Sequence, residues 1–226
     1  MLYYLAIPLT IALFFAFRKL YSLKPLAILN PVLLTIFALI GGILLFSLDY
    51  QQYDQGTNLL KQLLAPSIVA LAIPLYQQLH LIKSKFKNIL LVCLVSVFIS
   101  FSSAFYLMPL LGADQITAAS LAAQSVTTPI AVQISDSLNG IVSLTAAMVI
   151  FAGIIGASVG ISFLKKIGVN DKEAVGLAIG CSSHVLGTAK MVEVDETSGA
   201  ISSVALILCA LFSAIIIPML YHLLIV

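Results

Sequence analysis

Long apolar runs separated by short polar clusters dominate the pattern along this chain. Five uncharged runs occupy residues 2–17, 26–48, 88–110, 139–164 and 198–226. A helix needs about 20 apolar residues to cross the roughly 30 Å of hydrocarbon in a bilayer. A sixth run, 62–79, contains Pro66 and Pro74, and a proline inside a membrane helix frees backbone groups that need other partners. The pattern predicts about six spanning helices, of which the one at 62–79 is bent or broken.

Two further segments, 115–135 and 172–194, start as Ala-rich helix, are interrupted by a polar patch and then resume. The patches read "QSVTTP" and "GCSSHVLGTAK". Asp171 follows Asp114 by 57 residues where the segments begin, and Gly199 follows Gly140 by 59 where they end. This spacing predicts an internal repeat. The alternative is two Ala-rich helices that are alike in composition only.

The positions of the cations indicate how these segments sit, because Lys and Arg mark cytoplasmic loops. With the N-terminus outside, the acidic loop at 49–57 lies outside and a full crossing by 115–135 would place Lys165 and Lys166 outside as well. A re-entrant hairpin instead places both lysines inside. Each leg would have about 10 residues and a length of roughly 15 Å, half the hydrocarbon thickness.

One full helix separates the two interrupted segments, so they would enter from opposite faces and meet near the midplane, as in inverted-repeat secondary transporters. We therefore predict one all-α polytopic membrane domain over 1–226 with an elevator-like architecture. Residues 1–113 form mainly scaffold helices, and 114–140 and 171–199 form the two oppositely oriented re-entrant hairpins. Two ordinary kinked helices are the alternative.

Composition excludes a soluble domain. Hydrophobic residues make up 61% of the 226 residues and charged residues 9%, and the mean hydropathy is +1.14. A net charge of +2 is too small to indicate nucleic acid as a partner. The apolar start lacks a preceding cation, so we expect a retained first helix rather than a signal peptide. The expected location is the bacterial cytoplasmic (inner) membrane, with lipid as the surrounding solvent.

The residues that usually bind metals or catalyse reactions form no recognisable motif. Cys93, Cys181 and Cys209 lie inside apolar stretches and are interpreted as packing residues. The histidines fall in different segments, so neither a metal site nor a cofactor is expected. A G-x-S-x-G elbow is missing and no acid stands near His184, so we do not expect an enzyme.

The polar interruptions are the candidate binding site, because a restarting helix exposes free N–H groups with partial positive charge. Thr128 suits the N-cap of the first restart with Pro129 at the first helical position, and Ser182 or Ser183 suits the N-cap of the second. Two such N-termini would bind a small carboxylate without a buried arginine. The predicted substrate-binding residues are Gln124, Ser125, Thr127, Thr128, Pro129, Ser182, Ser183, His184, Gly187 and Thr188.

Two interpretations of His184 stay open. It is either a proton carrier or carboxylate partner, or a neutral histidine that holds the hairpin tip. Lys190 either reaches the substrate or extends to the cytoplasmic surface. Weaker candidates that would line the translocation path are Asn30, Pro66, Tyr76 and Gln77.

Three stretches, "LLAPSIVALAIPLYQQ", "QSVTTPIAVQIS" and "GCSSHVLGTAKMVEVDETSGAISSVA", resemble the LrgB/CidB family of bacterial membrane proteins. The resemblance covers nearly the whole chain. Members are described as antiholin-like, or as modulators of murein hydrolase export and autolysis. They are often paired with a smaller membrane protein of the LrgA/CidA type. One departure is Gln124, where we expect lysine in many members, so a direct charge contact to an anion would be missing.

Related proteins, including a plastid form, are associated with transport of glycolate, glycerate and pyruvate. The resemblance therefore implies transport of small carboxylates by this chain. We predict a secondary transporter or facilitator for small monocarboxylates, assembled as a homo-oligomer, in particular a dimer, with the smaller protein as a further partner. The alternative is a holin/antiholin-like regulator of murein hydrolase export and autolysis, which acts through assembly.

Overall fold

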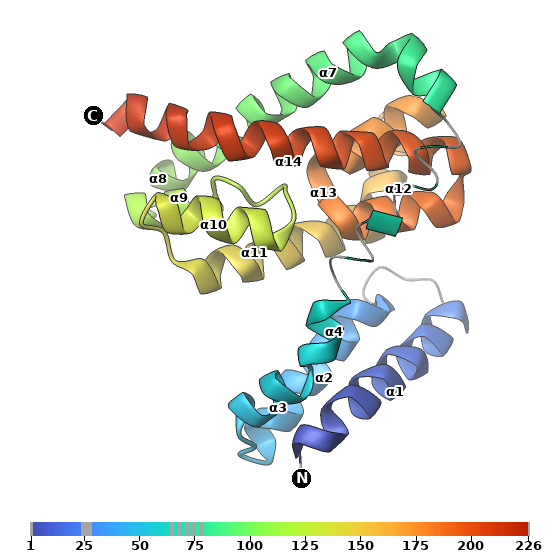
Figure 1. Cartoon of the computed structure of the whole chain (residues 1–226), viewed down its shortest axis with the longest axis vertical. Coiled ribbons are helices and arrows are strands. Elements are labelled where there is room, and N and C mark those ends of the chain that lie inside the picture. Colours follow the sequence, from blue (N-terminus) through green and yellow to red (C-terminus); the bar gives the residue numbers. More distant parts are fainter. Residues whose placement is uncertain are drawn as a thin grey trace. The chain divides into compact units, whose positions relative to one another are not determined.

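The computed structural model describes residues 2–23, 29–63 and 79–225, with the single positions 66, 69, 70, 73 and 76 between the last two ranges. In these residues all regular structure is helical (Figure 1). The chain divides into two compact units, Met1–Ala70 and Leu71–Val226. The predicted all-α class is therefore confirmed.

The first unit contains four helices. They are α1 (Leu2–Leu23), α2 (Pro31–Leu45), α3 (Tyr50–Gly56) and α4 (Asn58–Gln62). The Asn30 side chain begins α2 by accepting hydrogen bonds from the backbone N–H groups of Val32 and Leu33, at 2.9 and 3.3 Å. Pro31 follows at the start of the helix, where its missing N–H costs nothing.

The sequence predicts a loop over 49–57. This prediction is wrong, because most of the stretch forms α3. Asp49 caps this helix by accepting from the N–H of Gln51 at 2.9 Å. Gly56 lets the end of α3 approach α1, since a Cβ there would lie 2.3 Å from the Tyr3 carbonyl oxygen. Contact with α1 thus orders a polar stretch that shows no apolar periodicity of its own.

The second unit contains the longer helices. They are α7 (Leu79–Ser102), α8 (Met108–Leu110), α9 (Gln115–Leu121), α10 (Thr128–Ser137), α11 (Val142–Ile155), α12 (Ile161–Lys166), α13 (Lys172–Val194) and α14 (Glu196–Ile225). A π-helical turn, Ser103–Leu107, joins α7 to α8, and another, Gly156–Gly160, joins α11 to α12. Both pairs are therefore continuous helical rods.

Within the described residues, five helices are long and apolar enough to cross a membrane. They are Tyr3–Leu23, Lys83–Leu110, Val142–Lys166, Lys172–Val194 and Glu196–Leu224. Four of the five predicted runs match these helices, and the run at 26–48 forms the shorter α2 of 15 residues. The predicted broken helix at 62–79 lies largely outside the described residues. The protein is an all-α polytopic membrane protein.

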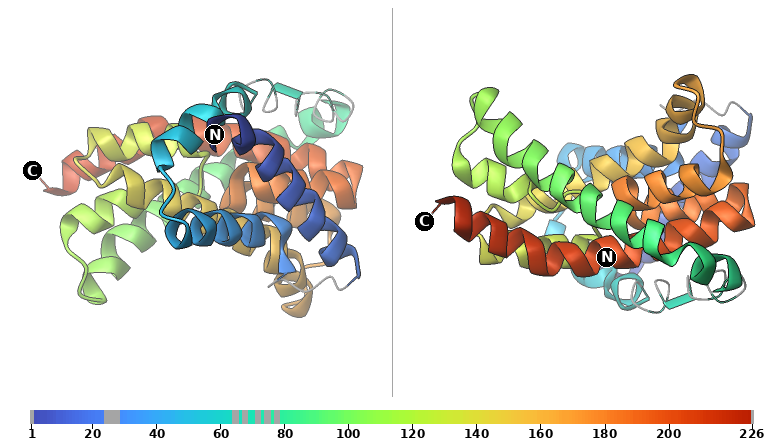
Figure 2. Two further views of the ribbon diagram at one scale, coloured as in Figure 1. Left: turned by 90° about the horizontal axis from the view of Figure 1, so that it is seen from below. Right: turned by 90° about the horizontal axis from the view of Figure 1, so that it is seen from above.

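Helices α13 and α14 form the centre of the second unit. In their most apolar stretches 56% and 61% of residues are buried, against 28% for α7–α8 and 22% for α11–α12. Helices α7 and α14 lie side by side (Figure 2). The polar interruptions therefore lie on or next to the most enclosed helices and not on the lipid-facing periphery.

Helix α13 folds back on itself at His184, whose backbone has φ 41° and ψ −138°. As a straight helix its 23 residues would span about 35 Å. Instead its two ends are adjacent, because Lys172 Nζ lies 2.6 Å from Asp195 Oδ1 and Ser198 Oγ donates to the Lys172 carbonyl at 2.8 Å. The segment is thus a helical hairpin. Its insertion into the bilayer from one face stays a prediction.

The first interrupted segment forms two short helices, α9 and α10, of 7 and 10 residues, and neither is long enough to cross a bilayer. The start of α11 packs beside α9, since the N–H of Ile141 donates to Ser120 Oγ at 2.7 Å. A Cβ on Gly140 would lie 3.0 Å from the Ser120 nitrogen, and one on Gly176 would lie 2.4 Å from the Ser198 carbonyl oxygen. In both segments the first leg therefore contacts the start of the following helix, which agrees with the predicted repeat.

The ion pair at the base of the α13 hairpin predicts a dependence of stability on pH. Lys172, together with the N–H of Ser198, lowers the pKa of Asp195 from 3.8 to about 2. Between these values the unfolded chain binds the proton and the folded chain does not, so stability falls as the pH drops from about 4 to 2. Thermal unfolding in detergent should show this loss in the native protein, and Asp195→Asn should flatten the profile in that window.

Asp136→Asn, which removes an exposed carboxylate at the end of α10, is the matched control for the loss of one charge. An equal flattening by both variants would contradict a specific role for the contact between Lys172 and Asp195.

Candidate functional site

A cavity of about 410 Å³ lies where the two interrupted segments meet α7 and α11. Its lining residues are Ser96, Ile99, Ser100, Gln124, Ser125, Met148, Phe151, Ala152, Ile155, Cys181 and Ser182. The two polar patches are far apart in sequence, and the fold brings one end of each to the same cavity. This convergence is the central feature of the candidate site.

The polar side of the cavity consists of hydroxyl groups and one amide. Gln124, Ser125 and Ser182 come from the predicted binding set, and Ser96 and Ser100 come from α7. Ser100 Oγ and Ser125 Oγ are 3.0 Å apart and share a hydrogen bond. Among the described residues that line the cavity, none carries a charge. Such a site can donate hydrogen bonds to a small polar molecule while the side chains from α11 contact its carbon atoms.

The backbone between α9 and α10 is irregular but enclosed by protein. Ala122, Ala123 and Val126 are each 1% exposed. The N–H of Val126 donates to the Ala123 carbonyl at 3.2 Å, and the N–H of Gln124 donates to the Leu121 carbonyl at 3.1 Å. Burial with internal hydrogen bonds is the condition under which non-helical backbone is tolerated at membrane depth.

The predicted N-cap of α10 is wrong by one residue. Thr127, not Thr128, has the extended backbone of an N-cap, with φ −62° and ψ 143°. Its carbonyl accepts from the N–H groups of Ile130 and Ala131 at 3.0 and 2.9 Å. The helix therefore begins at Thr128, with Pro129 inside the first turn. The Thr127 side chain makes no capping hydrogen bond, so the backbone turn before it sets the start.

The tip of the α13 hairpin is seated on α11. His184 is 4% exposed, and its Nε2 donates to the Val149 carbonyl at 2.7 Å. Two glycines, Gly153 of α11 and Gly156 at the start of the π-helical turn that follows it, make room for the tip. A Cβ on Gly153 would lie 2.5 Å from His184 Cε1, and one on Gly156 would lie 1.6 Å from Ser183 Oγ. The carbonyl can only accept, so Nε2 carries a hydrogen, and this geometry favours the interpretation in which His184 holds the tip.

The reversal of α13 occurs at His184, after both serines that were predicted to cap the restart. Ser182 Oγ donates to the carbonyl of Ala178 four residues earlier, at 2.8 Å, as a serine within a helix does. It therefore belongs to the first leg, and its prediction as the cap is wrong. The backbone torsion of His184 and the space beside Gly156 decide the position of the turn.

Several of the remaining predicted binding residues are buried in the protein, among them Thr127, His184 and Thr188, whereas Pro129 is exposed. Thr188 Oγ1 lies 2.9 Å from Ser202 Oγ of α14, and both residues are fully buried. Gly187 closes the hairpin, since a Cβ there would lie 2.5 Å from Ser183 Cβ. Of the ten predicted residues, Gln124, Ser125 and Ser182 line the cavity. For all ten, a role in binding substrate stays a prediction.

The weaker candidates are placed as follows. Asn30 caps α2, Pro66 and Tyr76 are exposed, and Gln77 lies outside the described residues. Lys190 Nζ lies 3.3 Å from Glu193 Oε2 in an exposed ion pair, which favours the surface interpretation of this lysine.

The sequence did not point to Ser96 and Ser100 on α7, or to the two glycines at the end of α11 and the start of the π-helical turn after it. A signal for the serines exists, because Cys93, Ser96 and Ser100 are spaced by three and four residues and so share one helix face. Gly153 and Gly156 are also three residues apart. In a membrane helix such small residues mark a close approach by another segment.

The fold and the cavity define a class: a multi-pass α-helical membrane protein in which two interrupted segments meet at a cavity that has polar groups on one side. The chain belongs to the LrgB-like family, whose family model matches residues 10–223. The resemblance stated from the sequence is therefore confirmed.

Relatives match over almost the whole chain. A Haemophilus influenzae protein described as uncharacterized is 38% identical over 196 residues, which cover 87% of this chain and 85% of that protein. YxaC of Bacillus subtilis is 36% identical over 211 residues, 93% of this chain and 92% of YxaC. The holin-like protein CidB of Staphylococcus epidermidis is 33% identical over 216 residues, 96% of this chain and 94% of CidB. No solved structure matches the chain.

The fit of the hairpin tip against α11 predicts that Gly156→Ala destabilises the protein. The added methyl group would overlap Ser183 Oγ, and overpacking of this kind costs about 1–3 kcal/mol of the free energy of unfolding. Reversible unfolding in mixed micelles measures the change. The matched control is Gly41→Ala in α2, where nothing lies within 4 Å of the added Cβ. It should raise stability by about 0.5–1 kcal/mol. Equal effects of the two substitutions would contradict the packing argument.

The left-handed backbone at His184 predicts an unusual order of stability among variants. A residue other than glycine in this region costs about 1–3 kcal/mol. His184→Ala keeps the strain and loses the hydrogen bond to Val149, whereas His184→Gly loses the bond but relieves the strain. Because glycine adds freedom to the unfolded chain, the net advantage of His184→Gly over His184→Ala is about 1–2 kcal/mol. Unfolding free energies in micelles test this, and a His184→Gly variant less stable than His184→Ala would refute it.

Proposed function

We propose that the protein is a holin-like protein of the bacterial cytoplasmic membrane that regulates export of murein hydrolases and autolysis. The observation that carries this proposal is the similarity to relatives named holin-like protein CidB, at 32–33% identity over 96% of this chain and 94% of theirs. Because almost the full length of both chains is matched, the comparison concerns the whole membrane protein and not one shared module.

The outer surfaces of the long helices support an activity carried out within the membrane. Large apolar side chains of α7 and α14 are exposed, with Leu91 at 63% and Met219 at 65%. Such faces suit lipid or a second membrane protein, either another copy of this chain or a smaller LrgA/CidA-type partner. In this proposal the protein acts by changing the state of the membrane and catalyses no reaction.

Deletion of the gene for this protein should change the amount of active murein hydrolase outside the cell and the rate of autolysis. Zymography of the culture fluid and the fall of optical density in detergent measure the two effects. Complementation with the native gene should restore both, and Gly156→Ala should restore them only in part if the seated hairpin tip is required. Unchanged zymograms and lysis curves in the deletion strain would refute the proposal.

A second function, facilitated passage of small monocarboxylates such as pyruvate, lactate and glycolate, is favoured by the cavity between the interrupted segments. Its volume of about 410 Å³ lies in the range of roughly 300–1,000 Å³ found for small-molecule sites. The amide of Gln124, together with the one O–H of the Ser100–Ser125 pair that is not used between the two serines, supplies donors for a carboxylate. A neutral cavity would bind an anion weakly and release it readily, which suits passage better than storage.

Proteoliposome uptake of labelled pyruvate, lactate and glycolate tests this second function. Ser125→Ala should reduce uptake by about fivefold, because loss of one hydrogen bond costs about 1 kcal/mol. Ser137→Ala removes an exposed hydroxyl of α10 outside the cavity and should leave uptake unchanged. Absence of saturable uptake, with and without the smaller partner, would refute the carrier function. It would leave the holin-like proposal standing on its own assay.

A further inference from the structure

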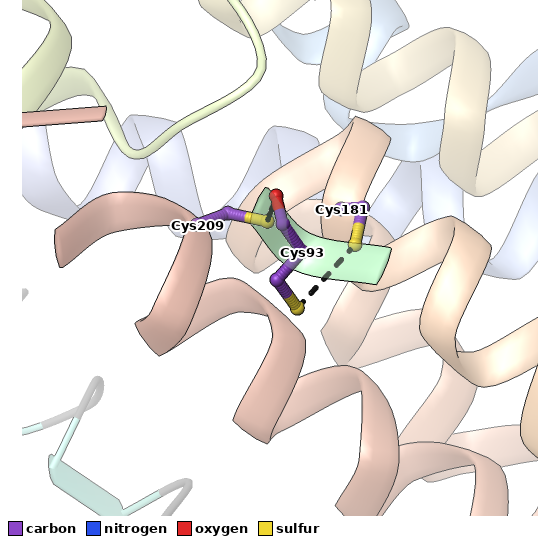
Figure 3. Close-up of side chains that lie close together, drawn as sticks. All are labelled: Cys93, Cys181 and Cys209. Atoms are coloured by element: carbon purple, nitrogen blue, oxygen red, sulfur yellow. Dashed lines mark hydrogen bonds between the residues drawn. The ribbon is translucent and has the colours of Figure 1, made fainter. Parts of the chain in front are cut away.

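All three cysteines of the chain meet at one place inside the second unit (Figure 3). Cys93 lies on α7, Cys181 on the first leg of α13 and Cys209 on α14, and all are at most 4% exposed. Their sulfur atoms lie within 4.8 Å of one another, and the Cys93 and Cys181 sulfurs are 3.8 Å apart. Residues separated by 88 and 116 positions in sequence thus place three thiols in a single cluster.

We propose that Cys93, Cys181 and Cys209 form a buried three-sulfur site for a soft, thiophilic metal ion of the copper(I) class. This inference does not depend on the proposed function, because it concerns thiol groups that supply no donor to the carboxylate and requires no transport. It is an alternative to the interpretation of the cysteines as packing residues without a metal site.

The sulfur spacing fits a three-coordinate ion. An ion about 2.3 Å from each of three sulfurs in one plane holds those sulfurs about 4.0 Å apart. The distance between the Cys93 and Cys181 sulfurs, 3.8 Å, is already close to this value, and the 4.8 Å bound on the other distances requires a shift of less than about 1 Å. A disulfide would need the same sulfurs at about 2.05 Å, which demands a larger displacement.

The number of ligands selects the class of ion. Among the described residues, the potential ligand group contains these three cysteines and no histidine or carboxylate. Structural zinc sites almost always have four ligands, whereas thiolate ligands also suit copper(I). A set of three sulfurs therefore fits copper(I) better than zinc. Binding releases protons from the thiols, since the thiolate is the ligand.

The cavity described above supplies an access route. Cys181 lines that cavity together with Ser96, which follows Cys93 by three residues on the same face of α7. An ion that enters the cavity therefore reaches Cys181, whose sulfur lies 3.8 Å from the Cys93 sulfur. The Ser96 hydroxyl is placed to donate a hydrogen bond toward a negatively charged metal–thiolate group.

The test is copper(I) binding by the purified, full-length protein in detergent, fully reduced and kept free of oxygen. Titration against bicinchoninate, a chromophoric copper(I) chelator, should show one ion retained per chain. Loss of a residue that only hydrogen-bonds to a metal ligand reduces metal affinity by about 10–100-fold. Loss of a ligand itself should reduce the affinity by at least that much. Each of Cys93→Ser, Cys181→Ser and Cys209→Ser should therefore weaken binding at least about tenfold. The triple variant should retain none.

Two controls keep the test decisive. Ser137→Ala leaves the cluster intact and should bind copper(I) like the native protein. If a serine variant fails to fold, the readout becomes protection of the native thiols from maleimide by bound copper(I) after the protein is unfolded in denaturant, counted by mass spectrometry. Reduced native protein that retains no copper(I), or a triple variant that binds as tightly as the native protein, would overturn the proposal. Tighter retention of zinc than of copper(I) would overturn the assignment of the ion. A disulfide between Cys93 and Cys181 in the purified protein, with no copper(I) bound after that disulfide is reduced, would assign the cluster to thiol exchange instead.

Discussion

A bilayer offers no hydrogen-bond partners to backbone groups, and the second unit is built around that constraint. Regular helices satisfy their own N–H and carbonyl groups, so they can face lipid with Ile, Leu and Phe side chains. The interrupted segments cannot satisfy all of their backbone groups in this way, and they pack against α7, α11 and α14. Ala122, Ala123 and Val126 are fully enclosed, and the His184 ring is hydrogen-bonded to the carbonyl of Val149. In these segments protein atoms supply the hydrogen-bond partners that water supplies to a loop of a soluble protein.

Small residues make this enclosure geometrically possible. Gly153 on α11 and Gly156 in the π-helical turn after it receive the tip of the α13 hairpin. Gly176 and Gly180 on the first leg of the hairpin allow the backbone of α14 to approach directly. Buried hydroxyl groups then pair across these short distances, as in the contact between Thr188 and Ser202. Close packing and polar pairing are the interactions available to helices in lipid, where apolar burial alone gives little drive for association.

The sequence was sufficient to predict the helical class and the long apolar runs, because their composition leaves no alternative to membrane helices. It also located both interruptions, since Ser, Thr, Gly and His stand out in an apolar background. It could not locate what depends on the neighbouring element. The register of the α10 start, the turn at His184 instead of at the serines, and the helical form of 50–56 are each decided by contacts with other segments.

The same limit applies to the candidate site. Gln124, Ser125 and Ser182 could be selected from their own segments, whereas Ser96 and Ser100 belong to a run that looks like an ordinary spanning helix. The cysteine cluster was missed because its members have no local motif. Only the fold, which brings α7, α13 and α14 together, reveals that three isolated thiols are neighbours.

The glycine contacts between α13 and α14 have a mechanical consequence. Where Gly176 and Gly180 face Ser198 and Ser202, backbone atoms interlock with no side chain between them that could change rotamer. Sliding along such a contact would force carbonyl groups past one another, so the hairpin and the first half of α14 behave as one rigid body. Any displacement of the hairpin must therefore be taken up along its boundaries with α7 and α11, where side chains form the contact and can repack.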